Sequence, residues 1–489
     1  MEYYIGIDIG TSGVKLTAIN EAAMIVGSYE REYQYDEPEP GWKEIWPEVW
    51  VDAVRSGLND LLSDLDRQAV KVIGFTGQMH TTVFIDENGQ TIRPAIMWND
   101  MRTKDYVPAI KRLLNENDTT AIQKIISTGS PALNLLWLKK HEEDNFKKLH
   151  KFLIGPDYLV YYFSGQYSTD YCEASTSSLY DSENQTWSET MRKLIGLDQS
   201  VYPPIKGSQE IVGTLRAELQ SEYGLSSEVK IIAGTGDNPA SAVATGCLSQ
   251  RYPVLSIGTS GILMLSRNKI ARNMKGKRIL FSLDGKQINN LVQGAVQSAG
   301  GSYGWYVKKI LKVDDFDTMT ETVDITKLGE NQLLFYPHLT GDKTIYADPT
   351  VRGAFLGLDT NHTREDMAIA VMEGISFAIK QLAQAMQLSE EELHKLKVTG
   401  GGANSKVWMQ ILADVLNVEI AQLDSNEGAS YGAALMAKNA VNSHHISVEL
   451  SHSVKLKNSI KPRPYHVELY LQKYNKYLKI YDALKMVYQ

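Results

Sequence analysis

The sequence predicts an α/β protein made of two similar domains, and three observations support this fold class. The chain of 489 residues is too long for one ordinary hydrophobic core. A five-residue sequence occurs twice, half a chain apart. Segments with strand and helix patterns alternate in each half. We therefore expect residues 1–245 to form an N-terminal domain and residues 246–489 a C-terminal domain, with a central cleft between them.

The composition indicates a soluble protein of the reducing cytosol. Hydrophobic residues make up 43% of the chain and charged residues 22%, and no run approaches the roughly 18 apolar residues needed to span a bilayer. A net charge of -8 disfavours nucleic acid or an anionic membrane as the main partner. The first strand begins near residue 3, which leaves no room for a signal peptide. Two cysteines, Cys172 and Cys247, are too few for a disulfide scaffold.

The repeated sequence is a short turn bounded by glycines. It reads Ile9-Gly10-Thr11-Ser12-Gly13 in the first half and Ile257-Gly258-Thr259-Ser260-Gly261 in the second. Apolar and β-branched residues flank both copies, which predicts two β-hairpins. One copy alone is more often an ordinary turn, but two identical turns that open the two halves indicate a shared role. Backbone N–H groups and hydroxyls without bulky neighbours suit a phosphate chain.

The residue before each turn differs between the two copies. Asp8 precedes the first turn and Ser256 the second. A carboxylate beside phosphates is repelled unless a cation lies between them. Asp8 therefore suggests a Mg²⁺ site, either directly or through water.

A helix over residues 46–65 and a strand over residues 70–75 lead to a polar group that could bind a sugar. The strand is followed by Gly77-Gln78-Met79-His80, and Trp98-Asn99-Asp100 follows another apolar segment. Sugars need paired donors and acceptors for their hydroxyls and an apolar surface for their C–H face. A lone histidine is more often structural, so His80 is a candidate sugar contact only because Gln78, Met79 and the Trp98-Asn99-Asp100 group accompany it. The remaining histidines lack metal-ligand spacing, and no zinc site is predicted.

A second carboxylate lies at the end of a predicted strand. Residues 231–233 are apolar and run into Gly234-Thr235-Gly236-Asp237-Asn238. Asp237 in this place could accept the proton of a substrate hydroxyl that attacks phosphorus. The same residues also suit an ordinary turn. From this segment alone the two readings are equally good.

Late in the chain, the pattern is again strand, glycine turn and helix. Residues 397–399 read as a strand that ends in three glycines, and residues 405–416 read as a helix. A strand at 418–422 and a helix at 430–440 follow. This arrangement directs backbone N–H groups at an anion.

Together these segments resemble the FGGY family of carbohydrate kinases over residues 3–440. Each motif is weak alone, but five occur in the family's order. The first phosphate motif looks like residues 7–15 and the second like residues 256–261. The adenosine segment looks like residues 400–405 and the helix start after it like residues 427–434, while residues 293–302 look like the stretch whose glycine approaches the nucleotide.

The resemblance implies two domains of ribonuclease-H-like, actin-like ATPase fold, with ATP and sugar in the cleft. Asp237 matches the catalytic base, and Asp8 matches the carboxylate associated with Mg²⁺ and activity. The implied sugar-binding residues are Gln78, Met79, His80, Asp100, Asp237 and Asn238. The implied nucleotide-binding residues are Gly10, Thr11, Ser12, Gly13, Lys15, Gly258, Thr259, Ser260, Gly300, Gly401, Gly402 and Ser405.

Within the family, the xylulokinases are most similar. This implies transfer of the γ-phosphoryl group of MgATP to D-xylulose, which gives D-xylulose 5-phosphate, and family precedent suggests a homodimer. The alternatives are a kinase for another ketose, a polyol or a sugar acid, of the ribulose or gluconate type. More remote alternatives are an actin-like or chaperone-like ATPase and a catalytically inactive sugar sensor.

Three positions depart from the family pattern. Asn134 stands where the family usually has lysine. Residues 341–345 read Gly-Asp-Lys-Thr-Ile in place of Gly-Glu-Arg-Thr-Pro, and Ala429-Ser430 replaces Pro-Ala. None of them touches the carboxylates or the phosphate turns, so they bear on substrate choice and not on the kinase chemistry.

Overall fold

The computed structural model describes residues 1–116, 126–248, 252–268, 273–321, 323–424, 428–441 and 456–488. The chain forms two compact units. Unit 1 comprises Met1–Ser249, Ile279–Asn290 and Glu427–Ser453, and unit 2 comprises Gln250–Arg278, Leu291–Asn426 and Val454–Gln489. The units therefore differ from two continuous halves, because a late helix, α15 (Ala429–Val441), packs on the first sheet of unit 1.

Unit 1 is built on a seven-stranded mixed sheet with the order β13-β14-β5-β1-β2-β3, and β15 lies beside β5. Its strands are β1 (Tyr3–Ile9), β2 (Gly13–Asn20), β3 (Ile25–Glu32), β5 (Val70–Gly77), β13 (Ile211–Thr214), β14 (Lys230–Ile232) and β15 (Thr235–Gly236). The first predicted hairpin is confirmed, since β1 and β2 pair antiparallel with Ile9 opposite Val14.

Strand register brings three predicted segments to one edge of this sheet. Strands β1 and β15 both run parallel to β5, and Gly77 pairs with Ile9 on one side and Gly236 on the other. Parallel strands end at a common edge, where ligands bind in open α/β sheets. Gly10, Gln78 and Asp237, the residues that follow these strands, therefore share that edge.

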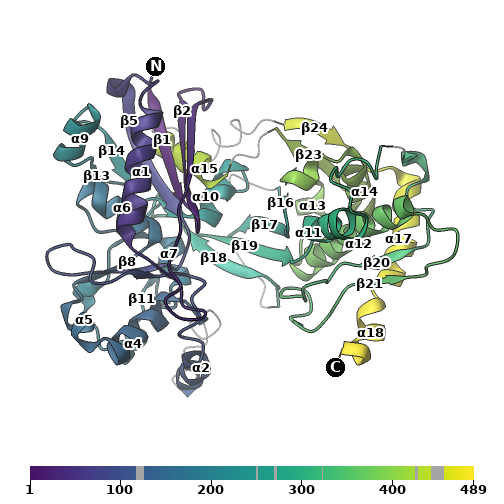
Figure 1. Cartoon of the computed structure of the whole chain (residues 1–489), viewed down its shortest axis with the longest axis horizontal. Coiled ribbons are helices and arrows are strands. Elements are labelled where there is room, and N and C mark those ends of the chain that lie inside the picture. The colour runs from purple at the N-terminus through teal and green to yellow at the C-terminus, as the bar shows by residue number, and fades with distance from the viewer. Residues whose placement is uncertain are drawn as a thin grey trace. The chain divides into compact units, whose positions relative to one another are not determined.

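Helices cover both faces of the sheet (Figure 1). Helices α1 (Pro47–Leu61) and α6 (Gly155–Ser164) pack on the face to which Ile5, Ile7 and Ile9 point. Helices α10 (Asp237–Ala244) and α15 lie side by side on the opposite face, against Tyr4. Alternate residues of a strand point to opposite faces, so Gly6 and Asp8 point to the α10 and α15 side.

Helix α15 approaches its neighbours backbone to backbone. A Cβ atom added to Gly6 of β1 would lie 1.9 Å from the carbonyl oxygen of Ser430. A Cβ added to Gly432 would lie 1.9 Å from the carbonyl oxygen of Ala240 in α10. Both positions require glycine because the clashing atoms are backbone and cannot rotate away. This packing holds α10 against the sheet.

Unit 1 also contains a second, smaller core around residues such as Leu133, Trp137 and Phe152. Its four-stranded sheet has the order β4-β7-β6-β8. The remaining strands of unit 1 are β4 (Glu44–Ile45), β6 (Thr82–Ile85), β7 (Ala95–Ile96), β8 (Lys151–Ile154), β9 (Thr169–Asp170), β10 (Tyr180–Asp181), β11 (Thr186–Trp187) and β12 (Ile205–Lys206). The remaining helices of unit 1 are η1 (Arg67–Ala69), α2 (Tyr106–Glu116), α4 (Pro131–His141), α5 (Glu143–Lys148), α7 (Tyr171–Thr176), α8 (Glu189–Ile195), η2 (Gln199–Val201) and α9 (Ala217–Tyr223).

Unit 2 contains a second seven-stranded sheet, with the order β18-β19-β17-β16-β22-β23-β24. The second predicted hairpin is confirmed, because β16 and β17 pair antiparallel with Ile257 opposite Gly261. The strands of this sheet and the further strands of unit 2 are β16 (Val254–Ile257), β17 (Gly261–Arg267), β18 (Lys277–Phe281), β19 (Asn289–Val296), β20 (Leu334–Tyr336), β21 (Ala354–Leu356), β22 (Lys395–Thr399), β23 (Glu419–Leu423) and β24 (Leu456–Ile460). Most of β18 and the first two residues of β19 fall within Ile279–Asn290 of unit 1.

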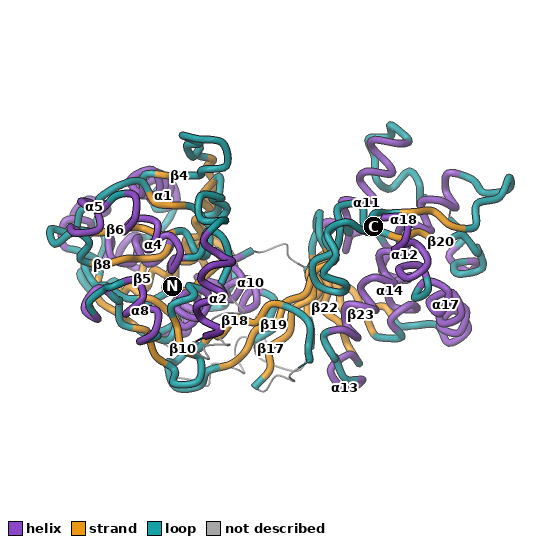
Figure 2. The backbone as a smooth tube through the Cα atoms, turned by 90° about the horizontal axis from the view of Figure 1, so that it is seen from below, coloured by secondary structure: helices purple, strands orange, loops and turns teal. Residues whose placement is uncertain are grey.

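Three helices of unit 2, α12, α14 and α17, pack on one another (Figure 2). They share one large core with the strands, in which Trp408 is almost completely buried. The helices of unit 2 are α11 (Gly300–Gly304), η3 (Trp305–Ile310), η4 (Ile325–Lys327), α12 (Arg364–Ala385), α13 (Glu390–Leu393), η5 (Gly401–Asn404), α14 (Lys406–Leu416), α17 (Pro464–Tyr477) and α18 (Ile480–Tyr488). Among the described helices, none is both long and apolar enough to cross a membrane.

Replacing Gly6 by alanine should destabilise unit 1 by about 3 kcal/mol or more, because the new methyl group has no room against the backbone of α15. Gly428→Ala is the matched control, since no atom of the described residues lies within 4 Å of its added Cβ. Urea unfolding followed by tryptophan fluorescence measures both variants. Equal midpoints for the two variants would contradict the tight packing of α15.

Candidate active site

The first glycine turn connects β1 and β2 and is closed by its own hydrogen bond. The Gly10 N–H donates to the Gly13 carbonyl at 2.8 Å. The Gly10 N–H is therefore not available to a ligand, whereas the sequence led us to expect that every N–H group of the turn would be available. Within the described part of the chain, the amides of Thr11 and Ser12 donate no hydrogen bond. These two amides are the ones available to an anion.

The second turn, in unit 2, is also closed by the N–H of its first glycine, but the acceptor lies one residue earlier than in the first turn. The Gly258 N–H closes the turn on the Ser260 carbonyl at 3.0 Å, and the Gly300 N–H donates to the Gly258 carbonyl at 2.9 Å. Gly300 therefore buttresses the turn. The amides of Thr259 and Ser260 find no acceptor among the described residues. Identical sequences thus leave equivalent amides available in both units.

Asp8 and Asp237 repel each other at the edge of the first sheet. Burial and, to a smaller extent, the Asp237 carboxylate raise the pKa of Asp8 to about 7, although Lys15, its cross-strand neighbour in the hairpin, lowers it. One oxygen of Asp8, Oδ1, is buried and has no hydrogen-bond partner among the described residues. An unpartnered carboxylate oxygen beside a second carboxylate fits a cation.

The described residues do not form a complete metal cage. No group of three or more His, Cys, Asp or Glu side chains that could hold a metal ion occurs among them. A Mg²⁺ ion at Asp8 would therefore take most of its six ligands from water and phosphate oxygens. This is the usual way in which Mg²⁺ binds at phosphate-transfer sites.

Direct contacts join the predicted base to the predicted sugar motif. Asp237 begins helix α10, and its Oδ1 accepts a hydrogen bond from Asn238 Nδ2 at 3.0 Å. The same Nδ2 lies 3.1 Å from Met79 Sδ, which lies 3.9 Å from Cys172 Sγ. Segments 159 residues apart thus meet side chain to side chain. The turn that the sequence also allowed is in fact the start of a helix.

Gln78 and His80 have different positions within the sugar motif. Gln78 is buried, its Nε2 donates to the Gly10 carbonyl at 3.1 Å, and its Oε1 accepts from Thr81. The side chain thus ties the sugar motif to the first turn, a use that the sequence analysis did not predict. His80 is half-buried and its backbone has a positive φ of 70°.

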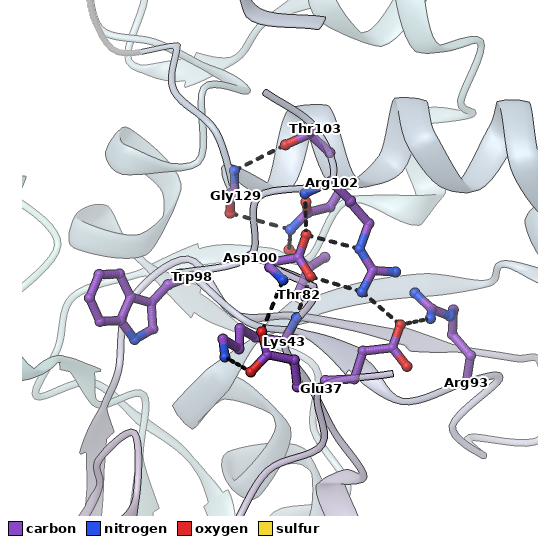
Figure 3. Close-up of polar contacts among 12 residues, drawn as sticks. Glu37, Lys43, Thr82, Arg93, Trp98, Asp100, Arg102, Thr103 and Gly129 are labelled. Atoms are coloured by element: carbon purple, nitrogen blue, oxygen red, sulfur yellow. Dashed lines mark hydrogen bonds and ion pairs between the residues drawn. The ribbon is translucent and has the colours of Figure 1, made fainter. Parts of the chain in front are cut away.

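Asp100 is the centre of a buried ion network (Figure 3). Its carboxylate accepts from the Arg102 side chain at 2.8 and 2.9 Å and from the Lys43 N–H at 2.6 Å. Arg102 also pairs with Glu44 at 2.7 Å, and Glu44 pairs with Arg93. Both carboxylate oxygens of Asp100 therefore have internal partners. The structure shows the role of Asp100 in this network, and its predicted sugar contact stays a prediction.

An exposed tryptophan next to this network in the sequence lies beside the first turn. Trp98 lies two residues before Asp100, its side chain is 45% exposed, and its Nε1 donates to Thr11 Oγ1 at 3.0 Å. The Tyr33 hydroxyl donates to the Gly10 carbonyl at 2.5 Å. The sequence analysis did not single out Tyr33, because the residues around it carry no motif.

The late glycine turn in unit 2 is shaped by its neighbours. Gly400 has a φ of +90°, which favours glycine, and Cβ atoms at Gly400 and Gly402 would lie 2.6 and 2.4 Å from atoms of Ile257. Among the residues that the structure describes, none has an atom within 4 Å of a Cβ at Gly401, so this glycine faces open space between them. Ser405 caps α14, because its Oγ accepts from the Trp408 N–H at 3.3 Å. Glu427, in the motif that follows, lies outside the described residues.

The departures from the family pattern have internal partners. Asn134 is buried, and its Nδ2 donates to Thr82 Oγ1 at 2.9 Å and to the Gly129 carbonyl at 3.3 Å. Asp342 accepts from the Tyr346 N–H at 2.6 Å within its own loop. Ser430 Oγ lies 2.8 Å from Thr17 Oγ1, so α15 is bonded to β2.

Comparison with known proteins identifies the chain. Residues 3–244 match the N-terminal domain, and residues 254–441 the C-terminal domain, of the FGGY family of carbohydrate kinases. A xylulose kinase of Staphylococcus xylosus is 32% identical over 99% of this chain and 100% of its own length. A crystal structure of a xyloylose kinase from Brucella ovis is 30% identical, with a TM-score of 0.88 over 99% of this chain and 100% of that one.

The fold and these relatives define the class of protein. The chain is an ATP-dependent phosphotransferase that acts on sugars, and its α/β architecture consists of two actin-like ATPase domains. Both the predicted fold class and the predicted enzyme class are confirmed. The chain belongs to the FGGY family of carbohydrate kinases.

Replacing Arg102 by leucine should destabilise unit 1 by about 3 kcal/mol or more, because Asp100 and Glu44 would be left buried without their shared partner. Arg55→Leu is the matched control, because Arg55 pairs with Glu222 at the surface and should contribute less than about 1 kcal/mol. Urea unfolding of both variants measures the difference. A loss for Arg102→Leu no larger than that of the control would show that the network does not stabilise the fold.

Proposed function

We propose that this kinase phosphorylates D-xylulose on its terminal hydroxyl, O5, and releases D-xylulose 5-phosphate and ADP. The single observation that carries the proposal is the contact chain from Asp237 through Asn238 to Met79, because it places the sugar motif next to a carboxylate. The xylulose kinases at about 30% identity support the choice of a ketopentose.

Asp237 is the proposed general base. In this proposal it takes the proton of the sugar hydroxyl as that oxygen attacks the γ-phosphorus and the bond to the β-phosphate oxygen breaks. Its place at the start of α10, held by Asn238, keeps the carboxylate oriented. Met79 and His80 are the proposed sugar contacts on the neighbouring strand end.

Asp8 is the proposed carboxylate for Mg²⁺, on the evidence of its unpartnered Oδ1. A bound Mg²⁺ ion would supply neutralisation of the phosphate charge. The available amides of Thr11 and Ser12 in unit 1, and of Thr259 and Ser260 in unit 2, are the proposed phosphate donors. Gly401, beside open space, is the proposed neighbour of the adenosine.

A panel of pentuloses, hexuloses, polyols and gluconate in a coupled ADP-release assay tests the substrate. The highest kcat/KM is expected with D-xylulose, because its hydroxyls must match the donors and acceptors around His80 and Asn238. A clear preference for another ketose, a polyol or gluconate would replace D-xylulose by that sugar. ADP release that does not depend on any sugar would remove the proposal.

Asp237→Asn should lower kcat at least about a hundredfold, since the amide cannot accept the hydroxyl proton, while ATP still binds. Steady-state kinetics and titration calorimetry with ATP measure the two effects. Asp198→Asn is the control, because Asp198 is an exposed acid that caps a short helix and should leave kcat unchanged. Near-normal turnover of Asp237→Asn would exclude Asp237 as the base.

A further inference from the structure

A row of buried carboxyl groups lies beneath the candidate active site. Asp157, Asp170 and Glu173 are each no more than 2% exposed. Glu173 lies in the first turn of α7, which Asp170 caps by accepting from the Glu173 N–H at 3.0 Å. The sequence analysis assigned no role to any of the three.

The cap of α7 is anchored close to the proposed base. Asp170 accepts from the hydroxyls of Thr235 at 2.6 Å and Ser208 at 3.1 Å. Thr235 lies two residues before Asp237, in the short strand β15 that leads into α10. Helix α7 is thus tied to the strand that positions Asp237.

Glu173 itself contacts both strand ends that form the site. Its Oε2 accepts a hydrogen bond from the His80 N–H at 3.4 Å. Its Oε1 lies 2.9 Å from the position of a Cβ on Gly236 and has no hydrogen-bond partner among the described residues. One carboxyl group therefore lies between the residue at the end of the sugar motif and the residue before the proposed base.

The backbone of His80 needs such a partner. A φ of 70° is uncommon for a residue with a side chain and costs on the order of 1 kcal/mol. Strained conformations of this kind persist where the surrounding structure enforces them. Glu173 fixes the N–H of His80, and Thr82 Oγ1 donates to its carbonyl at 3.0 Å.

The surroundings of Glu173 favour its uncharged form. Burial raises its pKa well above the usual range, and Asp157, Asp170 and Asp237 raise it further, while the hydrogen bond from His80 opposes them. A neutral carboxyl group still accepts a hydrogen bond. Glutamine has the same shape and the same accepting oxygen, so it is the closest substitute.

We propose that Glu173 is a positioning residue that holds the backbone of His80 and the approach to Asp237 in register, and so sets the affinity for the sugar. The inference rests on the proposed function of His80 and Asp237. Glu173 touches no reacting atom and acts through these two segments.

Two variants test the proposal, Glu173→Leu and Glu173→Gln. Leucine removes the acceptor, so KM for the sugar should rise about tenfold and kcat should fall by a similar factor, because misplaced groups lose rate steeply. KM for ATP should stay within about twofold, since the phosphate turns do not contact Glu173. Glutamine keeps the acceptor and should stay within about threefold of the wild type in all three constants.

Asp157→Asn is the matched control, because it alters a buried carboxyl of the same row whose side chain bonds to the Ile154 N–H and, among the described residues, forms no hydrogen bond to His80 or Gly236. It should leave KM for the sugar and kcat unchanged. If Glu173→Leu does not fold, Glu173→Asp replaces it, since the shorter side chain withdraws the carboxyl from His80 and should also raise KM for the sugar.

Three outcomes would overturn the inference: unchanged sugar kinetics in Glu173→Leu or its replacement, an equal loss in Glu173→Gln, or a parallel rise in KM for ATP. The variants are assayed with the sugar that the wild type accepts best. A wrong substrate therefore shows in the wild-type panel, whereas a wrong role for Glu173 shows only in the variants.

Discussion

The close approach of α15 to the first sheet is the constraint on which the rest of unit 1 depends. Gly6 admits the backbone of α15 to β1, and Gly432 admits the backbone of α10 to α15. Helix α10 begins with Asp237, and β1 carries Asp8 on the same face. The separation of the two carboxylates is thus set by contacts without side chains, which cannot adjust by rotation. Helix α15, which comes late in the chain, therefore fixes the separation of Asp8 and Asp237, which precede it by about two hundred residues or more.

Unit 1 gathers several carboxyl groups near one sheet edge and handles each by a different physical means. Asp100 forms an ion pair with Arg102 and accepts a hydrogen bond from the Lys43 N–H. Burial and neighbouring acids raise the pKa of Asp157 and Glu173 well above the usual range. Asp8 is between these cases, near Lys15 and Asp237. Where an acid has no paired cation, burial favours its protonated form, and Asp8 keeps an oxygen without a hydrogen-bond partner among the described residues, which fits a cation.

The two glycine turns show how one sequence serves twice. In each, the first glycine N–H closes the turn and the next two amides are left available. The difference lies outside the turn, where β1 carries Asp8 and β16 carries Ser256. Of the two turns, the first therefore combines available amides with a carboxylate, which gives the two units unequal parts in the proposed chemistry.

The sequence by itself determined the elements and the chemistry at their ends: the hairpins around Gly10 and Gly258, the helix after Gly402, and a carboxylate in Asp237. These signals are local, because turns and periodic patterns depend on neighbouring residues. Only the tertiary structure decided that α15 belongs to unit 1, that Asp100 accepts hydrogen bonds from the Arg102 side chain, and that Glu173 accepts one from the His80 N–H. Such contacts join residues far apart in the chain, and their geometry depends on packing that no single segment encodes.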